Sequence, residues 1–335
     1  MLKKIINSAR IEMDIIPIDP LLIKSGQASV SGVDMAFVRT YRSGEKDEPF
    51  IPGSSLKGVI RSYAEKICRS LKDSPVPVCL PYLKPKGKAE KGGERQYSCG
   101  LLFEKFKKDK NLKTVSTPDV YRLSCPACRL FGSHGFIGRL ATSDAYLTKS
   151  FKAQGRPVFE IRDGVAIDRI TGGTVGGAKY DLEVLTRGEF ATSLDIRNFE
   201  RWQLGMIALV LRDMEDGLVR IGFGKSRGLG RFKAKVTRFR ITYYHRKPDT
   251  LSGLHALCSD NDRQQYGFFE ESKKNAFELP QAEPNGLRNE YDLTDSWKTA
   301  LAPAVNDLIS YIETLPWPAD LEKYLKGEDH VVSAG

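Results

Sequence analysis

The stretch from Ile51 to Arg61, IPGSSLKGVIR, limits what this chain can fold into more than any other, because it leads into a helix. Apolar residues recur at helical spacing through and after it: Leu56, Val59, Ile60, Tyr63, Ala64, Ile67, Cys68 and Leu71. This spacing predicts an amphipathic helix over Ser54–Leu71 with one face in the core.

The polar start of this helix has the composition of an anion-binding site. Gly53 frees the backbone, and we expect Ser54 or Ser55 to cap the first unpaired amides. The helix N-terminus then points its amides at an anion, and Lys57 and Arg61 add positive charge. A phosphate group is the expected ligand.

Charge is unevenly distributed along the 335 residues, whose net charge is +10. Residues 246–335 contain 9 Lys or Arg and 16 Asp or Glu, whereas residues 1–245 contain 43 and 26. A basic body favours a polyanion such as nucleic acid as partner, although many basic surfaces are only solvated.

The hydrophobic content of 41% allows one large core or two smaller ones. No stretch approaches the ~20 apolar residues that span a membrane, and the first residues carry charges where a signal peptide would be apolar. We expect no membrane contact and a cytoplasmic location.

Strand and helix patterns follow a simple order once two irregular stretches, residues 74–124 and 151–188, are set aside. Strand-like runs occur at residues 10–24, 140–147, 189–197 and 232–244, and a second apolar helix is expected at 202–214. The β-α-β-β-α-β order predicts an α+β, ferredoxin-like fold. In the acidic extension, residues 296–315 form an amphipathic candidate that Pro303 weakens.

Four of the six cysteines have a spacing that suits a metal. Cys125 and Cys128 form a C-x-x-C knuckle, and Cys79 and Cys99 lie in the Pro-, Gly- and Lys-rich stretch before it. Four thiolates suit a structural zinc that folds an insertion lacking its own core. Alternatively, the knuckle is a redox pair or an unligated turn, and Cys79 and Cys99 are ordinary cysteines.

Two glycine-rich segments and one aspartate complete the candidates. IGFGKSRGLGRF, residues 221–232, brings Lys225, Arg227 and Arg231 to a flexible backbone, although a plain hairpin explains it as well. TGGTVGG, residues 171–177, predicts the tip of a hairpin. Asp34 could activate a 2′-hydroxyl, hold a divalent ion or cap a turn.

Taken in order, these segments resemble the RAMP superfamily, specifically the repeated backbone subunit of type III CRISPR effector complexes. The resemblance covers about residues 10–240 and rests on GVDMAFVR, PFIPGSSLKGVIRS, CPACRLFGS, RLATSDAYL, VAIDRITGGT and IGFGKSRGLGRF. It implies a modified RNA-recognition fold in residues 1–245, with a zinc-bearing insertion at 75–130 and a thumb hairpin at 153–188. Residues 246–335 would be an acidic C-terminal extension.

The resemblance also implies a function for particular residues. Several copies would stack on a guide (CRISPR) RNA with other complex subunits, and Asp34 would cut base-paired target RNA with Mg²⁺ or another divalent ion. The guide RNA would contact Ser54, Ser55, Lys57, Arg61, Lys225, Ser226, Arg227 and Arg231. The thumb would include Ile167, Asp168, Arg169, Ile170 and Thr171, and zinc would bind Cys79, Cys99, Cys125 and Cys128.

The chemistry agrees with a metal-dependent endoribonuclease. Cleavage through a 2′-hydroxyl needs an in-line geometry and one placed carboxylate, and base pairing supplies the sequence specificity. A non-catalytic guide-binding subunit is the alternative. A guide-RNA processing endonuclease is less favoured, because no histidine lies in the glycine loop.

Overall fold

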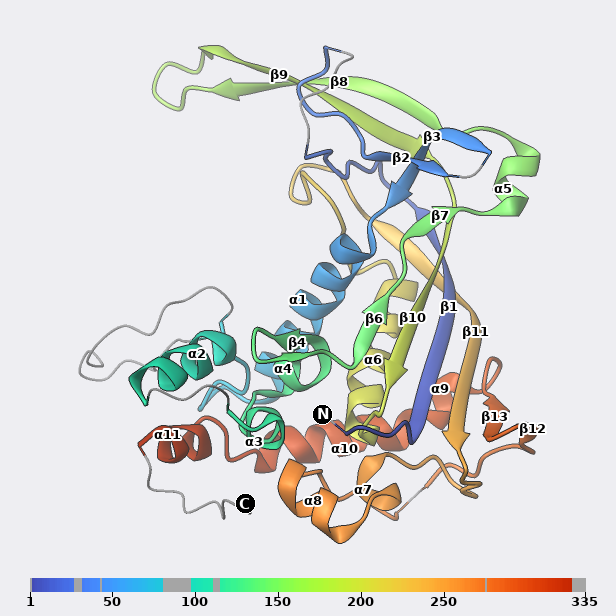
Figure 1. Cartoon of the computed structure of the whole chain (residues 1–335). Helices are drawn as coiled ribbons and strands as arrows, with labels where there is room; N and C mark the ends of the chain where they lie inside the picture. The colour runs from blue at the N-terminus through green and yellow to red at the C-terminus, as the bar shows by residue number, and fades with distance from the viewer. Residues whose placement is uncertain are drawn as a thin grey trace.

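The computed structural model describes residues 2–26, 32–42, 44–80, 98–110, 115–274 and 276–326. Parts of three predicted segments lie outside the described residues: 27–31 of the loop before Asp34, 81–97 and 111–114 of the insertion, and 275 and 327–335 of the extension. The molecule is a mixed α+β structure built on one large antiparallel sheet (Figure 1).

The large sheet has the strand order β12-β13-β11-β1-β10-β7-β3-β2, and β6 pairs with β10. Its central strands are β1 (Asn7–Pro17), β10 (Phe190–Arg197), β11 (Phe232–Tyr244), β6 (Leu140–Thr142) and β7 (Ala145–Leu147). Alternate residues of β1, including Ile11, Met13 and Ile15, are buried, because successive side chains of a strand point to opposite faces.

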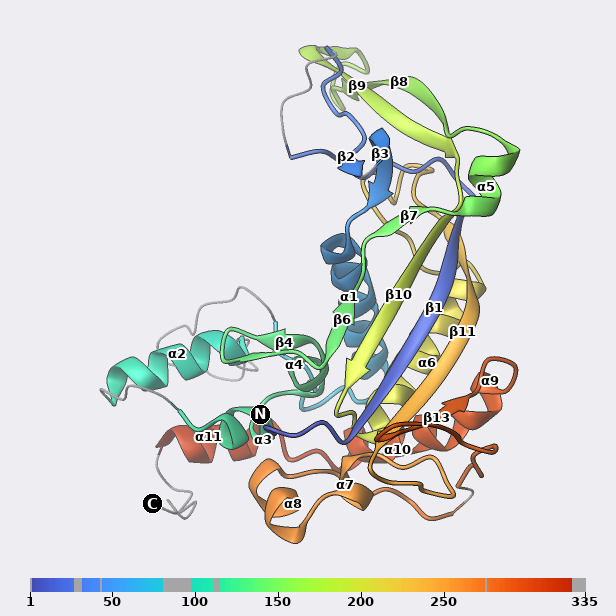
Figure 2. The ribbon, with the colours of Figure 1, turned by 45° about the vertical axis from the view of Figure 1, so that its right-hand side comes forward.

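Two helices cover the buried face of this sheet in both ribbon views, α1 (Gly53–Leu71) and α6 (Arg201–Glu215) (Figures 1 and 2). Both predicted helices are therefore present, each one residue longer at its start. The predicted apolar face of α1 is buried at Leu56, Ile60, Ala64 and Cys68.

The C-terminal segment adds strands to the large sheet and a helix to the helical layer that covers it. β13 (Arg288–Asp292) pairs with β11, β12 (Glu283–Asn285) pairs with β13, and α10 (Ala302–Thr314) lies against α6. The predicted amphipathic segment 296–315 is two helices, α9 (Trp297–Ala300) and α10, because Pro303 favours the first turn of a new helix. The short helices are α7 (Leu254–Leu257), α8 (Asp260–Tyr266) and α11 (Ala319–Lys326).

A two-stranded hairpin projects from one end of the molecule, formed by β8 (Val158–Ile167) and β9 (Thr174–Arg187) (Figure 1). The chain turns earlier than the predicted tip at 171–177. The Asp168 amide donates to the Gly173 carbonyl and the Gly172 amide to the Asp168 carbonyl, both at 2.9 Å. Beside the hairpin lie β2 (Arg39–Arg42), β3 (Glu45–Ile51) and α5 (Lys149–Gln154).

The described part of the insertion packs beside the C-terminal half of α1. It contains α2 (Cys99–Asp109), α3 (Thr117–Arg122) and most of α4 (Pro126–Phe131), and the short strands β4 (Gly132–Ser133) and β5 (Phe136–Ile137) follow it. Among the described residues, no helix has the length and apolar character needed to cross a membrane.

Candidate nucleic-acid interface and metal centre

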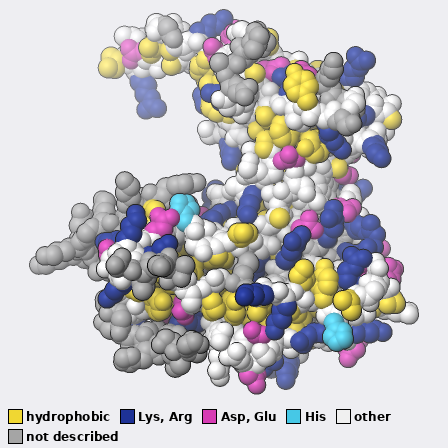
Figure 3. All heavy atoms as spheres, in the orientation of Figure 1, with side chains coloured by type: hydrophobic (Ala, Val, Ile, Leu, Met, Phe, Trp, Pro, Cys, Tyr) yellow, Lys and Arg dark blue, Asp and Glu magenta, His cyan; other side chains and the backbone are white. Residues whose placement is uncertain are grey.

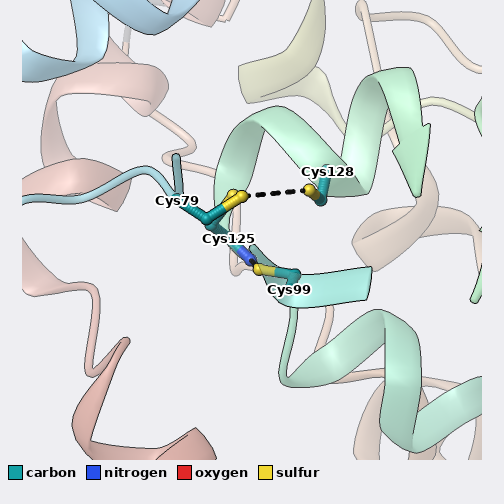
Figure 4. Close-up of side chains that lie close together, drawn as sticks. All are labelled: Cys79, Cys99, Cys125 and Cys128. Carbon is teal, nitrogen blue, oxygen red and sulfur yellow. Dashed lines mark hydrogen bonds between the residues drawn. The ribbon is translucent and has the colours of Figure 1, made fainter. Parts of the chain in front are cut away.

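Four cysteines from three segments of the chain lie close together (Figure 4). The sulfur atoms of Cys79, Cys99, Cys125 and Cys128 all lie within 4.8 Å of one another, and all four residues are buried. Cys99 is the first residue of α2, Cys125 precedes α4, and Cys128 lies within α4. None of the six cysteines forms a disulfide.

The donor set fits a tetrahedral metal ion. Zinc–sulfur bonds of about 2.3 Å place the sulfurs of a regular tetrahedron about 3.8 Å apart, and the Cys79 and Cys128 sulfurs are 3.5 Å apart. Burial raises the pKa of the Cys99 thiol, with its sulfur neighbours adding to the effect, so the thiolate form requires a nearby cation. Four close cysteines can hold a metal ion, and zinc is compatible with them.

The N-terminus of α1 is capped by a residue between β6 and β7. The prediction that Ser54 or Ser55 caps it is wrong, because the helix begins at Gly53 and no side chain at its N-cap bonds to it. Instead the Gly53 amide donates to the Asp144 carboxylate at 2.7 Å. Within the described chain, the amides of Ser54 and Ser55 have no acceptor and are available to an anion.

Gly53 is needed for close approach. A Cβ atom there would lie 2.6 Å from the Thr142 carbonyl oxygen, so a side chain would push β6 away from the helix start. The Thr142 hydroxyl also donates to the Gly53 carbonyl at 2.6 Å. The glycine thus allows two chain segments to meet at the helix start.

Lys57 and Arg61 point into the protein. The Lys57 ammonium donates to the Leu140 carbonyl at 2.9 Å, and burial, with the nearby Arg61 charge, lowers its pKa. The Arg61 guanidinium donates to Glu65, to the Gly132 carbonyl and to the Cys128 sulfur. Their predicted phosphate contacts stay predictions, and these internal hydrogen bonds already use one of the three Lys57 donors and three of the five Arg61 donors.

The glycine loop packs by its backbone on the segment after β1. The Phe223 amide donates to the Leu22 carbonyl at 2.8 Å, and a Cβ on Gly222 would lie 2.2 Å from the same oxygen. Lys225 is exposed, and partial desolvation together with the Lys66 charge lowers its pKa. Ser226 and Arg227 are exposed. The segment is therefore a fixed loop that presents polar side chains.

The loop also contacts the projecting hairpin. The Arg227 guanidinium donates to the Tyr180 hydroxyl of β9 at 2.8 Å and lies over the Phe223 ring. Arg231 forms an ion pair with Asp19 at 3.2 Å. Arg227 therefore joins the glycine loop to the hairpin.

Asp34 lies against the middle of the same hairpin. Its Oδ2 accepts a hydrogen bond from the Asp181 amide of β9 at 3.0 Å. Asp163 of β8 is paired with Asp181 in the hairpin register, and a hydrogen bond with Asp163 raises the pKa of the Asp181 carboxyl. Sequence reasoning missed both carboxylates, because 147 residues separate Asp34 from Asp181.

The hairpin is fixed at its base and exposed at its turn. Arg39 forms a bidentate pair with Glu183 at 2.6 and 2.8 Å and lies over the Phe159 ring. At the turn, Asp168 accepts hydrogen bonds from the Ile170 amide and the Thr171 hydroxyl. The Ile170 side chain is 95% exposed.

The predicted contacts therefore lie in two regions (Figures 1 and 2). The start of α1, the glycine loop, Asp34 and the hairpin lie at one end, and the cysteine cluster lies beside the insertion helices. Lys and Arg side chains are spread over much of the face in Figure 3, interspersed with Asp and Glu. The hairpin end is therefore distinguished from the rest of the surface by the predicted contact residues gathered there and not by an excess of positive charge.

A family model of the RAMP superfamily matches residues 15–233. The match covers more than half of the chain, so the protein belongs to the RAMP superfamily. No curated protein matches the chain. The match contains Asp34, α1, the four cysteines and the hairpin. Membership implies a CRISPR-associated subunit that binds CRISPR RNA and other subunits of a complex, in a family that includes some ribonucleases.

Proposed function

We propose that this protein is a guide-RNA-binding backbone subunit of a type III CRISPR effector complex and that it cleaves base-paired target RNA. The observation that carries the proposal is the hydrogen bond between Asp34 and the Asp181 amide, which joins the predicted cutting residue to the predicted thumb. The complex would work in the cytoplasm with further copies of this chain and other subunits.

The strand order supports a ferredoxin-like body. The strands β11, β1, β10 and β6/β7 are adjacent in that order, and the connections β1-α1-β6/β7 and β10-α6-β11 carry the two helices. This is the fourth-first-third-second strand order expected of a β-α-β-β-α-β fold with an antiparallel sheet. We propose that residues 1–245 form this body and that 246–335 extend it.

RNA would bind at the hairpin end rather than on the open face of the sheet. Simple RNA-recognition domains stack bases on aromatic residues of that face. Here the outward positions of β1, β10 and β11 carry a single aromatic residue, Tyr244 at the end of β11, and ion pairs such as Arg10–Asp195 and Arg240–Glu290 occupy others. The amides of Ser54 and Ser55, with Lys225, Ser226 and Arg227, are better placed for a phosphate backbone.

The thumb would separate the guide and target strands. Its turn, Ile167 to Thr171, combines exposed apolar side chains with a hydrogen-bonded backbone. Such a wedge can hold a nucleotide out of the stack, which gives the backbone freedom to adopt an in-line geometry.

Asp34 would act at that displaced nucleotide. The Asp181 amide holds one carboxylate oxygen of Asp34, which orients the other. The second oxygen could accept the proton of a 2′-hydroxyl or bind a divalent ion, and Asp163 and Asp181 add negative charge nearby. When bound, the ion would stabilise charge on the scissile phosphate.

The cleavage proposal is tested by Asp34→Asn in the assembled complex with matched guide and target RNA. Asn keeps an acceptor for the Asp181 amide but removes the charge, so we expect target cleavage to fall by at least about 100-fold while target affinity is retained. Glu12→Gln, on the open face of the sheet, is the control. Unchanged cleavage by Asp34→Asn would reject the catalytic role.

A non-catalytic subunit is the second candidate, and one observation favours it. Asp34 already has a structural partner in the Asp181 amide, which a residue kept only for loop geometry would also have. In that case the Asp34→Asn complex would cleave and bind target RNA as the unaltered complex does.

We also propose that Cys79, Cys99, Cys125 and Cys128 hold a structural zinc ion. The metal would join α2, α4 and the segment at the start of the insertion that contains Cys79. We expect about one zinc per chain in purified protein, and loss of that zinc after Cys125→Ser with Cys128→Ser. Cys258→Ser, at a buried cysteine outside the cluster, is the control. Undiminished zinc in the double variant would exclude this ligand set.

A further inference from the structure

Arg61 contacts the cysteine cluster directly, although it lies on α1 and outside the insertion. Its Nη2 donates to the Cys128 sulfur at 3.3 Å. Its Nη1 donates to the Gly132 carbonyl at 2.9 Å, just after α4, and its Nε donates to Glu65 at 2.9 Å. One guanidinium therefore connects α1 to both a cluster sulfur and the backbone that follows it.

A metal centre of this kind needs such a donor. Four thiolates around a divalent ion carry a formal charge of about −2, and these four cysteines are buried. Buried charge is stabilised only when neighbouring groups supply hydrogen bonds or opposite charge. The described residues offer such hydrogen bonds from the Cys125 amide to Cys99 at 3.4 Å, from the Cys79 backbone to Cys125 and from Arg61 to Cys128. Of these donors, only Arg61 is charged.

The guanidinium is also held in place by its other partners. Glu65 is buried and forms a second ion pair, with Arg69 at 3.7 Å. The Arg61 side chain is 24% exposed, so its position is set largely by the protein. This arrangement orients Nη2 toward the sulfur before any metal binds, and a donor fixed in advance loses little entropy on metal binding.

We propose that Arg61 is a positioning residue for the metal held by the four cysteines, and that through it the metal centre orients α1. The inference rests on the proposed zinc site. It gives Arg61 a role other than the phosphate contact predicted from the sequence. Because Asp144 holds Gly53 two turns earlier, α1 would be anchored at its start by the connection between β6 and β7 and in its middle by the metal centre.

The matched pair Arg61→Gln and Arg69→Gln tests this inference. Both variants remove a cationic partner of Glu65, but only the first removes the donor to Cys128. We expect zinc affinity, measured by competition with a chromogenic chelator, to fall about 10- to 100-fold in Arg61→Gln. Arg69→Gln should retain the affinity of the unaltered chain. Equal affinities in the two variants would overturn the proposal.

Cobalt substitution gives a readout that a general packing defect would not produce. The sulfur-to-cobalt absorption band depends on electron density at sulfur, which a hydrogen bond to Cys128 withdraws. We expect the band to shift in Arg61→Gln and not in Arg69→Gln. Arg61→Lys keeps the positive charge but loses the planar, forked set of N–H donors, so it should bind zinc with intermediate affinity. This variant also covers the case in which Arg61→Gln does not fold. Full zinc affinity and an unshifted band in Arg61→Lys would then count against the proposal.

The unaltered chain separates this proposal from the zinc proposal. If the purified chain binds no metal, the zinc site itself is rejected. If it binds zinc and Arg61→Gln binds zinc equally well, only the role of Arg61 is rejected. Guide-RNA affinity of metal-loaded Arg61→Gln adds a third readout. A smaller salt dependence of that affinity would favour a direct phosphate contact instead.

Discussion

Gly53, the first residue of α1, makes two contacts that fix the start of the helix. Gly53 donates a hydrogen bond to Asp144 and accepts one from the Thr142 hydroxyl; Thr142 ends β6, and Asp144 lies between β6 and β7. The same residue that opens the proposed phosphate site therefore also fastens the helix to the sheet.

Two glycines of α1 give a direct test of this double role. A Cβ on Gly53 would meet the Thr142 backbone at 2.6 Å, whereas a Cβ on Gly58 would meet nothing within 4 Å. We expect Gly53→Ala to lower the free energy of unfolding by about 1–3 kcal/mol through overpacking. Gly58→Ala should raise it by about 0.5–1 kcal/mol, because alanine favours helix. Urea denaturation measures both, and a stabilised Gly53→Ala variant would contradict the close-contact argument.

Helix α6 is packed between two other elements. The sheet covers one side of it and α10 the other, and a Cβ on Gly205 would lie 2.0 Å from the Ala304 carbonyl oxygen. Arg201, at its first turn, is buried and forms an ion pair with Asp307 of α10 at 2.6 Å. The acidic extension is thus fastened to the body through charged groups as well as apolar packing.

This junction should make stability depend on pH. Burial raises the pKa of Glu271 to about 7, with Gly253, Arg201, Asp307 and Glu200 as the other contributors. A carboxyl with a raised folded-state pKa favours folding when protonated. Its contribution is therefore fully present below its unfolded pKa of about 4.5 and is lost as pH rises through about 7.

Glu271→Gln isolates this contribution. The amide oxygen can still accept from the Gly253 amide, which donates to Glu271 at 3.0 Å, but it does not ionise. We expect the variant to be more stable than the unaltered chain at pH 8 and to lose less stability between pH 5 and pH 8. Glu270→Gln, at the neighbouring position, is the control for a general change in net charge. Parallel stability curves for the unaltered chain and Glu271→Gln would contradict the assignment.

The proposed RNA site and the cysteine cluster lie in different parts of the molecule. The hairpin end brings together the helix start, the glycine loop and Asp34, and the insertion side holds the cysteine cluster. Helix α1 runs between them, contacting the first region through its N-terminus and the second through Arg61. A change at the metal centre therefore has a defined structural route to the proposed RNA site.

Local patterns in the sequence determined several features of this protein. The spacing of apolar residues predicted α1 and α6 within one residue at their starts, because helix periodicity is a property of consecutive residues. The cysteine spacing selected the four residues that cluster, because metal ligands must be few and of the right type. The order of motifs also indicated the family that the comparison confirmed.

Only the tertiary structure decided which groups these elements bring together. Asp144 caps Gly53 across 91 residues, Arg61 reaches Cys128 across 67, and Asp34 meets Asp181 across 147. No local propensity encodes such pairs, since each depends on how the sheet, insertion and hairpin pack. The sequence by itself therefore supplied the helices, the ligand types and the family, and the packing of distant segments assigned their partners.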